Sequence, residues 1–338
     1  LAGLVFNVRF LAMFLLAQVL IAKLPQKELQ NLALRLVFWG GAAVVMFGAL
    51  QVLVLPNDFL RHFGYSQGII PPYFTIDNNE NYVRILSTLR GPNVLGAYIV
   101  FWLPILLVVT KRMWNVAQAY RILTVVFWLA GLVTLYGSGS RSAWFGAVLS
   151  VGLTALLLAC NPMRKKIIAG SAIAAALCAV VLLLNWNSDF VQTTLLHKDP
   201  TEQSSVNSDN QRQDSLADSL RSILDNPFGS GVGSANVAST YGSSPVTVEN
   251  YYLQVAQELG VLGLIIFIGI LVHVAVLLWK QRLLDVAAAL FAGLVGISVI
   301  GLVLPVWGDE TVSMLWWGMA GLYVFSAIKK PRRKNDAV

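Results

Sequence analysis

Apolar stretches of about 18 residues or more recur along the chain and are separated by short charged segments. A stretch of this length crosses the hydrocarbon core of a bilayer as an α-helix, and several of them are typical of a multi-pass membrane protein. Charged residues make up only 12% of the chain, about half the share in an ordinary soluble domain. We therefore predict an all-α, polytopic transmembrane fold rather than a soluble domain.

The pattern predicts about nine spans. Six of them occupy the first part of the chain, residues 1–186, and three occupy the last part, residues 261–338, which ends in a basic tail. Between these parts, residues 187–260 are expected to form a large loop domain that contains amphipathic helices. The expected spans are 1–24, 32–55, 92–110, 122–136, 143–160, 167–186, 261–279, 286–305 and 312–328.

Basic residues predict the orientation in the membrane, because cytoplasmic loops carry an excess of lysine and arginine. Every second connection is basic: Lys23 with Lys27, Lys111 with Arg112, 164–166, Lys280 with Arg282, and the tail 329–334. The connections 56–91, 137–142, 187–250 and 306–311 then face outward from a plasma (inner) membrane. Topology explains the net charge of +7, so we expect lipids and no nucleic acid as partners. This orientation places Leu1 outside, and we expect that upstream helices are missing.

Arginines on the outward side are few, which makes them informative. Arg141 lies in a Gly/Ser turn at the start of a span, where backbone N–H groups favour anions and a guanidinium suits phosphate. Arg90 precedes Pro92 at the start of another span, a position typical of a first helical turn. For each arginine the alternative is snorkelling or a surface ion pair.

The long polar loop has an internal order of its own. Apolar residues recur at helical spacing between 208 and 225, which predicts an amphipathic helix that also carries Arg212. Glycines at 229, 231 and 233 indicate a sharp turn with close backbone approach rather than a nucleotide-binding motif, since no strand precedes them. Thr247 is a candidate cap for the helix that follows.

Glu249 is the carboxylate that we single out, because it lies at the outer surface close to the glycine turn. As a general base it would take a proton from an attacking hydroxyl; alternatively it complements the dipole of the following helix. Asp309 and Glu310 form a second acidic pair, expected to orient Arg141, to contact sugar hydroxyls or to terminate a helix. The three histidines are scattered, so we predict no metal site and no cofactor.

Several short pieces of the sequence together resemble the O-antigen ligase and O-antigen polymerase superfamily of bacterial membrane glycosyltransferases. They follow in the order expected for that superfamily and span the chain from about residue 84 to residue 317. The pieces are Arg90-Gly-Pro-Asn-Val-Leu-Gly96, Gly139-Ser-Arg-Ser-Ala-Trp144, Arg212, Asn226-Pro-Phe-Gly-Ser-Gly-Val-Gly233 and the run from Glu249 to Gly263.

The resemblance implies transfer of a glycan from an undecaprenyl-diphosphate carrier to a hydroxyl of a glycan or lipid acceptor, without a nucleotide sugar. It implies that outer arginines hold the diphosphate. We accordingly predict catalytic roles for Glu249, Arg141 and Arg212. Substrate-binding roles are predicted for Arg90, Asn93, Asn250, Tyr252, Gly231 and Asp309.

One departure from the family pattern leaves the exact activity open. Ligases of this family have histidine before the asparagine of the loop-to-helix motif, whereas this chain has Glu249. A polymerase, or a ligase that acts on another acceptor, is therefore an alternative to a lipopolysaccharide ligase. Outside this class, a transporter of lipid-linked sugars would also need outer arginines, but it should carry ionisable groups near the bilayer midplane. A non-catalytic scaffold would give Glu249 and the arginines no purpose.

Overall fold

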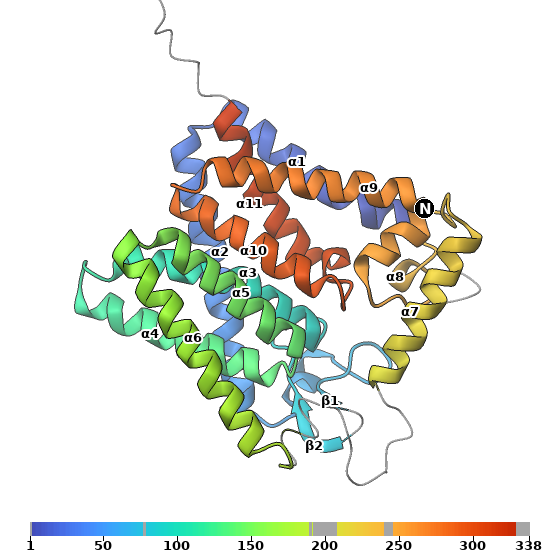
Figure 1. Ribbon diagram of the computed structural model, residues 1–338, viewed down its shortest axis with the longest axis horizontal. Coiled ribbons are helices and arrows are strands. Elements are labelled where there is room, and N and C mark those ends of the chain that lie inside the picture. The colour runs from blue at the N-terminus through green and yellow to red at the C-terminus, as the bar shows by residue number, and fades with distance from the viewer. Residues whose placement is uncertain (1, 77–78, 189–190, 192–207, 240–245, 329–338) are drawn as a thin grey trace, which may run out of the picture.

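The protein is a helical bundle with a smaller helical layer along one side (Figure 1). The computed structural model describes residues 2–76, 79–188, 191, 208–239 and 246–328. The long helices are α1 (Ala2–Lys23), α2 (Gln26–Leu53), α3 (Pro92–Met113), α4 (Gln118–Gly137), α5 (Arg141–Leu158), α6 (Asn161–Leu184), α9 (Tyr251–Lys280), α10 (Asp285–Ile300) and α11 (Glu310–Ile328). The shorter elements are η1 (Phe59–Phe63), β1 (Phe74–Ile76), β2 (Asn79–Arg84), α7 (Ser208–Asp225), α8 (Asn236–Ser239) and η3 (Val306–Gly308).

Five of the described helices are long and apolar enough to cross a membrane: α2, α3, α4, α5 and α9. Two shorter apolar helical segments, Ala12–Lys23 and Asp285–Ile300, accompany them. The prediction of a polytopic helical protein is confirmed at this level. The number of nine spans and the outward orientation of the long loop stay predictions.

Helix α3 lies at the centre of the bundle and packs against α4, α5, α10 and α11. Most of its side chains are buried, including Trp102, whose indole N–H donates a hydrogen bond to the Phe38 carbonyl at 3.1 Å. Glycines let the backbones come close: a Cβ on Gly146 of α5 would lie 3.2 Å from the Gly296 carbonyl oxygen of α10. Small residues at such contacts are typical of helix packing in membranes. The core thus holds the starts of α3 and α5 in place.

The segment 56–91 departs from the all-α prediction. Strands β1 and β2 pair in an antiparallel hairpin in which Phe74 is opposite Arg84 and Thr75 is opposite Val83. Aromatic and β-branched residues favour this conformation. Figure 1 shows the hairpin, α7 and α8 along one side of the bundle.

Some helix boundaries also differ from the expected ones. Lys27 and residues 164–166 lie inside α2 and α6 rather than in connections, because Pro25 and Pro162 start these helices earlier than the hydropathy pattern does. Helix α9 begins at Tyr251, ten residues before the expected span, and the backbone breaks from helical geometry at Gly260 (φ 76°, ψ 176°). The expected boundary at 260 therefore coincides with a kink within a helix.

Candidate active site

Four helices begin at neighbouring positions at one end of the bundle: α3 at Pro92, α5 at Arg141, α9 at Tyr251 and α11 at Glu310. The contacts described in the next paragraphs join each start to the next. A helix start has unpaired N–H groups and carries a partial positive charge. This end of the bundle is therefore suited to binding an anion.

Arg84, the last residue of β2, joins the starts of α3 and α5. Its Nε donates a hydrogen bond to the Ser138 carbonyl at 2.9 Å, and its Nη2 donates to Asn93 Oδ1 at 2.6 Å. The next residue, Ile85, donates its N–H to the Gly137 carbonyl at 2.9 Å. The amide of Asn93, which we predicted to bind substrate, thus accepts a hydrogen bond that orients the 137–141 turn.

The turn before α5 packs closely against α3. A Cβ on Gly96 would lie 2.6 Å from Ala143 Cβ and 3.1 Å from Ser140 Cβ, so only glycine allows this approach. Arg141 is the first residue of α5, directly after the cap residue Ser140, and it is half-buried. The structure therefore brings together two of the sequence pieces, 90–96 and 139–144, around the predicted anion site.

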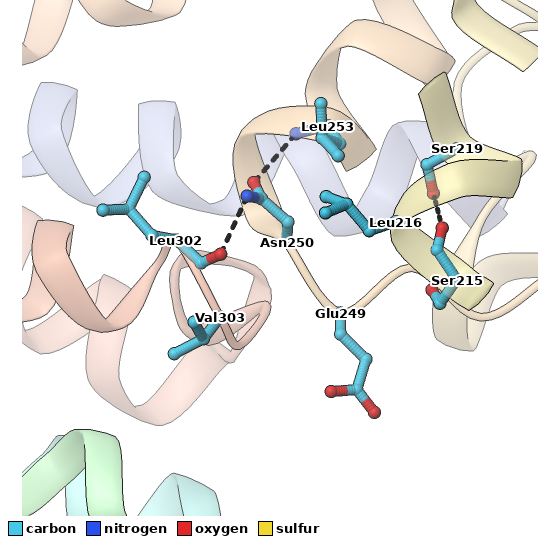
Figure 2. Close-up of a pocket in the computed structure, with 8 residues that line it drawn as sticks. All are labelled: Ser215, Leu216, Ser219, Glu249, Asn250, Leu253, Leu302 and Val303. Atoms are coloured by element: carbon cyan, nitrogen blue, oxygen red, sulfur yellow. Dashed lines mark hydrogen bonds between the residues drawn. The ribbon is translucent and has the colours of Figure 1, made fainter. Parts of the chain in front are cut away.

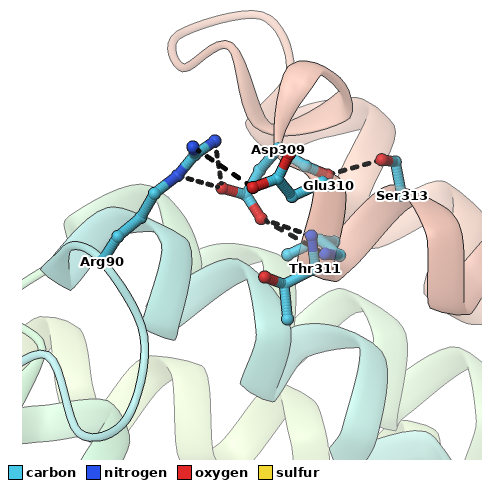
Figure 3. Close-up of polar contacts among 6 residues, drawn as sticks. Arg90, Asp309, Glu310, Thr311 and Ser313 are labelled. Atoms are coloured by element: carbon cyan, nitrogen blue, oxygen red, sulfur yellow. Dashed lines mark hydrogen bonds and ion pairs between the residues drawn. The ribbon is translucent and has the colours of Figure 1, made fainter. Parts of the chain in front are cut away.

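Arg90 forms an ion pair with the start of α11 (Figure 3). Its Nη2 lies 2.9 Å from Asp309 Oδ2, its Nε donates to the same oxygen at 3.0 Å, and its Nη1 lies 3.5 Å from Glu310 Oε1. Asp309 is buried, with 4% of its side chain exposed, whereas 37% of Arg90 is exposed. The pair fixes the start of α3 beside the start of α11.

Asp309 also caps α11, because its Oδ1 accepts the backbone N–H of Thr311 at 2.9 Å and of Val312 at 3.3 Å. The prediction that this residue ends or starts a helix is confirmed. Asp309 also binds Arg90, because the start of α3 lies directly beside that of α11. That the acidic pair orients Arg141 stays a prediction. One carboxylate thus serves both a cap and an ion pair.

Asn250 caps α9, which corrects the prediction for Thr247. The Asn250 Oδ1 accepts the N–H of Tyr252 at 2.9 Å and of Leu253 at 3.1 Å, and its Nδ2 donates to the Leu302 carbonyl at 2.8 Å. Asparagine is a preferred cap residue for this reason. Thr247 instead offers its carbonyl to the Ser215 hydroxyl of α7 at 3.0 Å. Asn250, which we predicted to bind substrate, holds α9 to the 301–305 connection.

Tyr252 holds α9 to α10 in the same way. Its hydroxyl donates to the Ser298 carbonyl at 2.9 Å, and the N–H of Tyr251 donates to the Gly301 carbonyl at 3.0 Å. The predicted substrate-binding residue Tyr252 is half-buried in this position. The start of α9 is therefore rigidly attached to the connection that leads to Asp309.

Glu249 lies immediately before the α9 cap and lines a pocket of about 150 Å³. Four of its eight lining residues are aliphatic and four are polar; the residues are Ser215, Leu216, Ser219, Glu249, Asn250, Leu253, Leu302 and Val303. In Figure 2 the Glu249 carboxylate extends away from Asn250 and Leu216. Glu249 is half-buried, so its carboxylate is placed at the edge of an apolar pocket.

Asn236 fixes the short segment that leads to Glu249. Its Nδ2 donates to the Val248 carbonyl at 2.9 Å and to Gln254 Oε1 at 2.6 Å, while its Oδ1 accepts the Val248 N–H at 2.8 Å. Gln254 in turn donates to Glu258 Oε1 at 3.1 Å. A hydrogen-bonded chain therefore runs from buried Glu258 on α9 to the residue next to Glu249.

The glycine turn packs against the kink of α9. Gly229, Gly231 and Gly233 all have positive φ, at 91°, 101° and 88°. The N–H of Gly231 donates to the Glu258 carbonyl and that of Gly233 to Glu258 Oε2, both at 3.1 Å. The sharp turn with close backbone approach is confirmed. Gly231, predicted to bind substrate, uses its N–H within the protein.

Arg212 is the one predicted site residue whose side chain the structure does not describe. The residue belongs to α7. Within the described residues, no group of three or more His, Cys, Asp or Glu side chains has the arrangement of a metal site.

Two residues of the site had no predicted role: Arg84 and Asn236. The only sequence signal for Arg84 is its place at the end of an outer loop. Asn236 is one of two described residues other than glycine with positive φ, at 53°, a conformation that asparagine tolerates better than most residues. No local pattern predicts its partners, which come from 10 to 18 residues further along the chain.

Comparison with known proteins gives one family match. Residues 124–268 match the family model for O-antigen ligase. The matched region runs from α4 to the middle of α9 and includes the Arg141 turn, α7, the glycine turn and Glu249. A search of curated proteins found no match to the chain.

Proposed function

We propose, from the match of residues 124–268 to the O-antigen ligase family model, that the protein transfers a glycan from undecaprenyl diphosphate to an acceptor hydroxyl. The family match supports the activity of a multi-pass membrane glycosyltransferase of the O-antigen ligase type. The observation that carries the finer proposal is the joining of four helix starts at one end of the bundle, beside Arg84, Arg90 and Arg141.

The donor in this proposal is recognised through its diphosphate. Helix starts stabilise anions through their N–H groups, and guanidinium groups bind phosphate oxygens in a bidentate manner. Arg141 and Arg212 bind the diphosphate, and Arg90, through its ion pair with Asp309, positions the start of α3 at the same end. Because Arg141 is half-buried at the first position of α5, its charge is screened less by solvent than that of an exposed arginine.

Glu249 acts as the general base. The acceptor oxygen bonds to the anomeric carbon of the glycan as the bond between that carbon and the diphosphate oxygen breaks. The hydroxyl proton moves to the Glu249 carboxylate, and the electron pair leaves with undecaprenyl diphosphate. Arginines stabilise the charge that grows on the leaving group, and positioning of the acceptor supplies much of the remaining rate acceleration.

The rigid attachment of Glu249 supports this role. Asn250, the residue after Glu249, is held by its side-chain hydrogen bond to the Leu302 carbonyl, and Asn236 holds the backbone of Val248, the residue before it. A base must lie within hydrogen-bond reach of the proton that it takes, which requires such positioning. A carboxylate that only complemented the α9 dipole would not need this support.

The test uses the purified full chain in nanodiscs with lipid-diphosphate glycan extracted from the source cells. Release of undecaprenyl diphosphate is measured for the wild type, Glu249→Gln and Arg141→Ala. Matched controls are Glu80→Gln and Arg61→Ala, which change an exposed carboxylate and an exposed arginine outside the site. We expect release to fall on the order of 100-fold or more in the site variants and to be unchanged in the controls.

The products separate the remaining alternatives. A ladder of lengths identifies a polymerase, whereas a single addition to a new acceptor identifies a ligase. Full release by a well-folded Glu249→Gln protein would remove Glu249 from the mechanism. Absence of release from the wild type, together with passage of the lipid across vesicle membranes, would replace the transferase by a transporter.

A further inference from the structure

Helix α7 carries a row of exposed leucines that the proposed reaction does not use. Leu216, Leu220 and Leu224 are 44%, 47% and 79% exposed, and Phe228 just after the helix is 94% exposed. We infer that this leucine row, residues 216, 220, 224 and 228, docks on the outer leaflet of the membrane. Helix α7 is then an interfacial helix that holds the loop domain against the lipid surface.

The sides of α7 are chemically distinct between residues 214 and 225. Ser215 and Ser219 face the 246–250 segment and α9: the Ser215 hydroxyl donates to the Thr247 carbonyl, and Ser219 is buried. Residues four apart lie on the same side of a helix, so the leucines form one flank of this buried face. The charged residues occupy the opposite flank and are exposed; these are Asp214, Asp218, Arg221 and Asp225.

Such a division is typical of helices that lie in the plane of a membrane interface. Their apolar side is buried about 5–10 Å into the boundary between headgroups and acyl chains, and their polar side stays in water. A row of large apolar residues left open to water on a folded protein marks an interaction site. In α7 one flank is therefore suited to lipid and the other to solvent.

The leucine row is continuous with the lipid-facing surface of α9. The N–H of Val261 donates to the Pro227 carbonyl at 3.0 Å, so Phe228 follows a residue bonded to the first turn beyond the α9 kink. Helix α9 is a candidate membrane span, and only 17% of its most apolar 18-residue stretch is buried. Its exposed apolar residues include Leu262, Ile265 and Ile266. The exposed apolar surface of α9 therefore continues onto Phe228 and then onto Leu224.

This continuity favours lipid rather than a second protein as the occupant. A bilayer that surrounds α9 has its interface at the level where the apolar part of α9 begins, which is the level of Phe228. The leucine row also reaches the pocket beside Glu249, since Leu216 lines it. The inference rests on the membrane placement of α9 and does not depend on the transferase activity.

The test measures the depth of nitroxide labels in nanodiscs of phosphatidylethanolamine and phosphatidylglycerol, with one protein per disc. Cys160→Ala and Cys178→Ala remove the native thiols, and single cysteines for labelling are introduced by Leu220→Cys, Leu224→Cys and Phe228→Cys. Control labels use Asp218→Cys and Arg221→Cys, on the charged flank of the same helix, where the side chains are 76% and 79% exposed. Three test positions keep the experiment decisive if one variant fails to fold.

Collisions with oxygen, which partitions into lipid, are compared with collisions with a water-soluble nickel chelate. We expect the oxygen-to-nickel ratio to be several-fold higher at positions 224 and 228 than at the controls, with 220 between them. Equal ratios on the two flanks would overturn the inference, because the leucines would then face water. Protection from both reagents would also overturn it, since protein rather than lipid would then cover the row.

Discussion

Gly229 and Gly260 touch backbone to backbone, and neither position has room for a side chain. A Cβ on Gly229 would lie 2.5 Å from the Gly260 nitrogen, and a Cβ on Gly260 would lie 2.6 Å from the Phe228 carbonyl carbon. Both glycines also have positive φ, at 91° and 76°. This contact fastens the glycine turn to the kink of α9 and so determines where the loop domain meets the bundle.

The first prediction concerns this contact. Gly229→Ala combines a strained φ, which costs about 1–2 kcal/mol, with overpacking against backbone that costs about 1–3 kcal/mol more. Gly231→Ala is the matched control, because Gly231 also has positive φ (101°) but has nothing within 4 Å of its Cβ position. Thermal unfolding in detergent should rank wild type, Gly231→Ala and Gly229→Ala in decreasing stability. Equal losses in both variants would mean that strain alone, and not the contact, decides the outcome.

A second prediction concerns the Arg90–Asp309 pair. Arg90→Ala leaves a buried carboxylate without its cation, and we expect a loss of about 1.5–3 kcal/mol in the free energy of unfolding. Asp309→Asn keeps an oxygen that can cap α11, so it should cost less than Asp309→Ala, which also removes the cap. A double-mutant cycle with Arg90→Ala and Asp309→Asn measures the pair directly. Additive effects of the two changes would show that the pair contributes nothing of its own.

The third prediction tests Asn236 as a positioning residue for Glu249. Asn236→Gly keeps a residue that accepts φ 53° and removes only the side-chain amide, with its three hydrogen bonds to Val248 and Gln254. We expect kcat to fall on the order of tenfold or more, because loss of position at a reacting group costs rate directly, while KM for the lipid-linked donor stays unchanged. Ser215→Ala, which removes a single hydrogen bond to Thr247, is the control for general loosening of the same segment. A rise in donor KM with normal kcat would contradict the assignment.

A fourth prediction separates the geometry of Arg84 from its charge. Arg84→Lys keeps the positive charge, but an ammonium group lacks the planar fork that reaches Ser138 and Asn93 together. We expect KM for the lipid-linked donor to rise on the order of tenfold, which corresponds to about one lost hydrogen bond. Arg61→Lys, at an exposed arginine that pairs with Asp58, should have no effect. Normal kinetics in Arg84→Lys would show that charge alone is sufficient at this position.

The sequence by itself determined the class of fold and much of the local structure. Apolar stretches long enough to span a bilayer predicted the helices, because backbone groups in lipid must be paired within one segment. The positive φ of Gly229, Gly231 and Gly233 was predictable for a local reason, since glycine adopts this conformation without strain. The amphipathic helix at Ser208–Asp225 was equally readable from its spacing.

Tertiary structure alone decided which polar groups meet. Arg90 and Asp309 are 219 residues apart, and Arg84 reaches Ser138 across 54 residues. A single sequence contains no periodicity that pairs such positions, so the ion pair of Arg90 with Asp309 was not predicted. The sequence offered Thr247 as a cap of α9, whereas the structure uses Asn250, whose side chain also bonds the Leu302 carbonyl, and Thr247 instead accepts from Ser215. Periodicity reports which face of a helix is buried, but only packing places the ends of separate helices side by side.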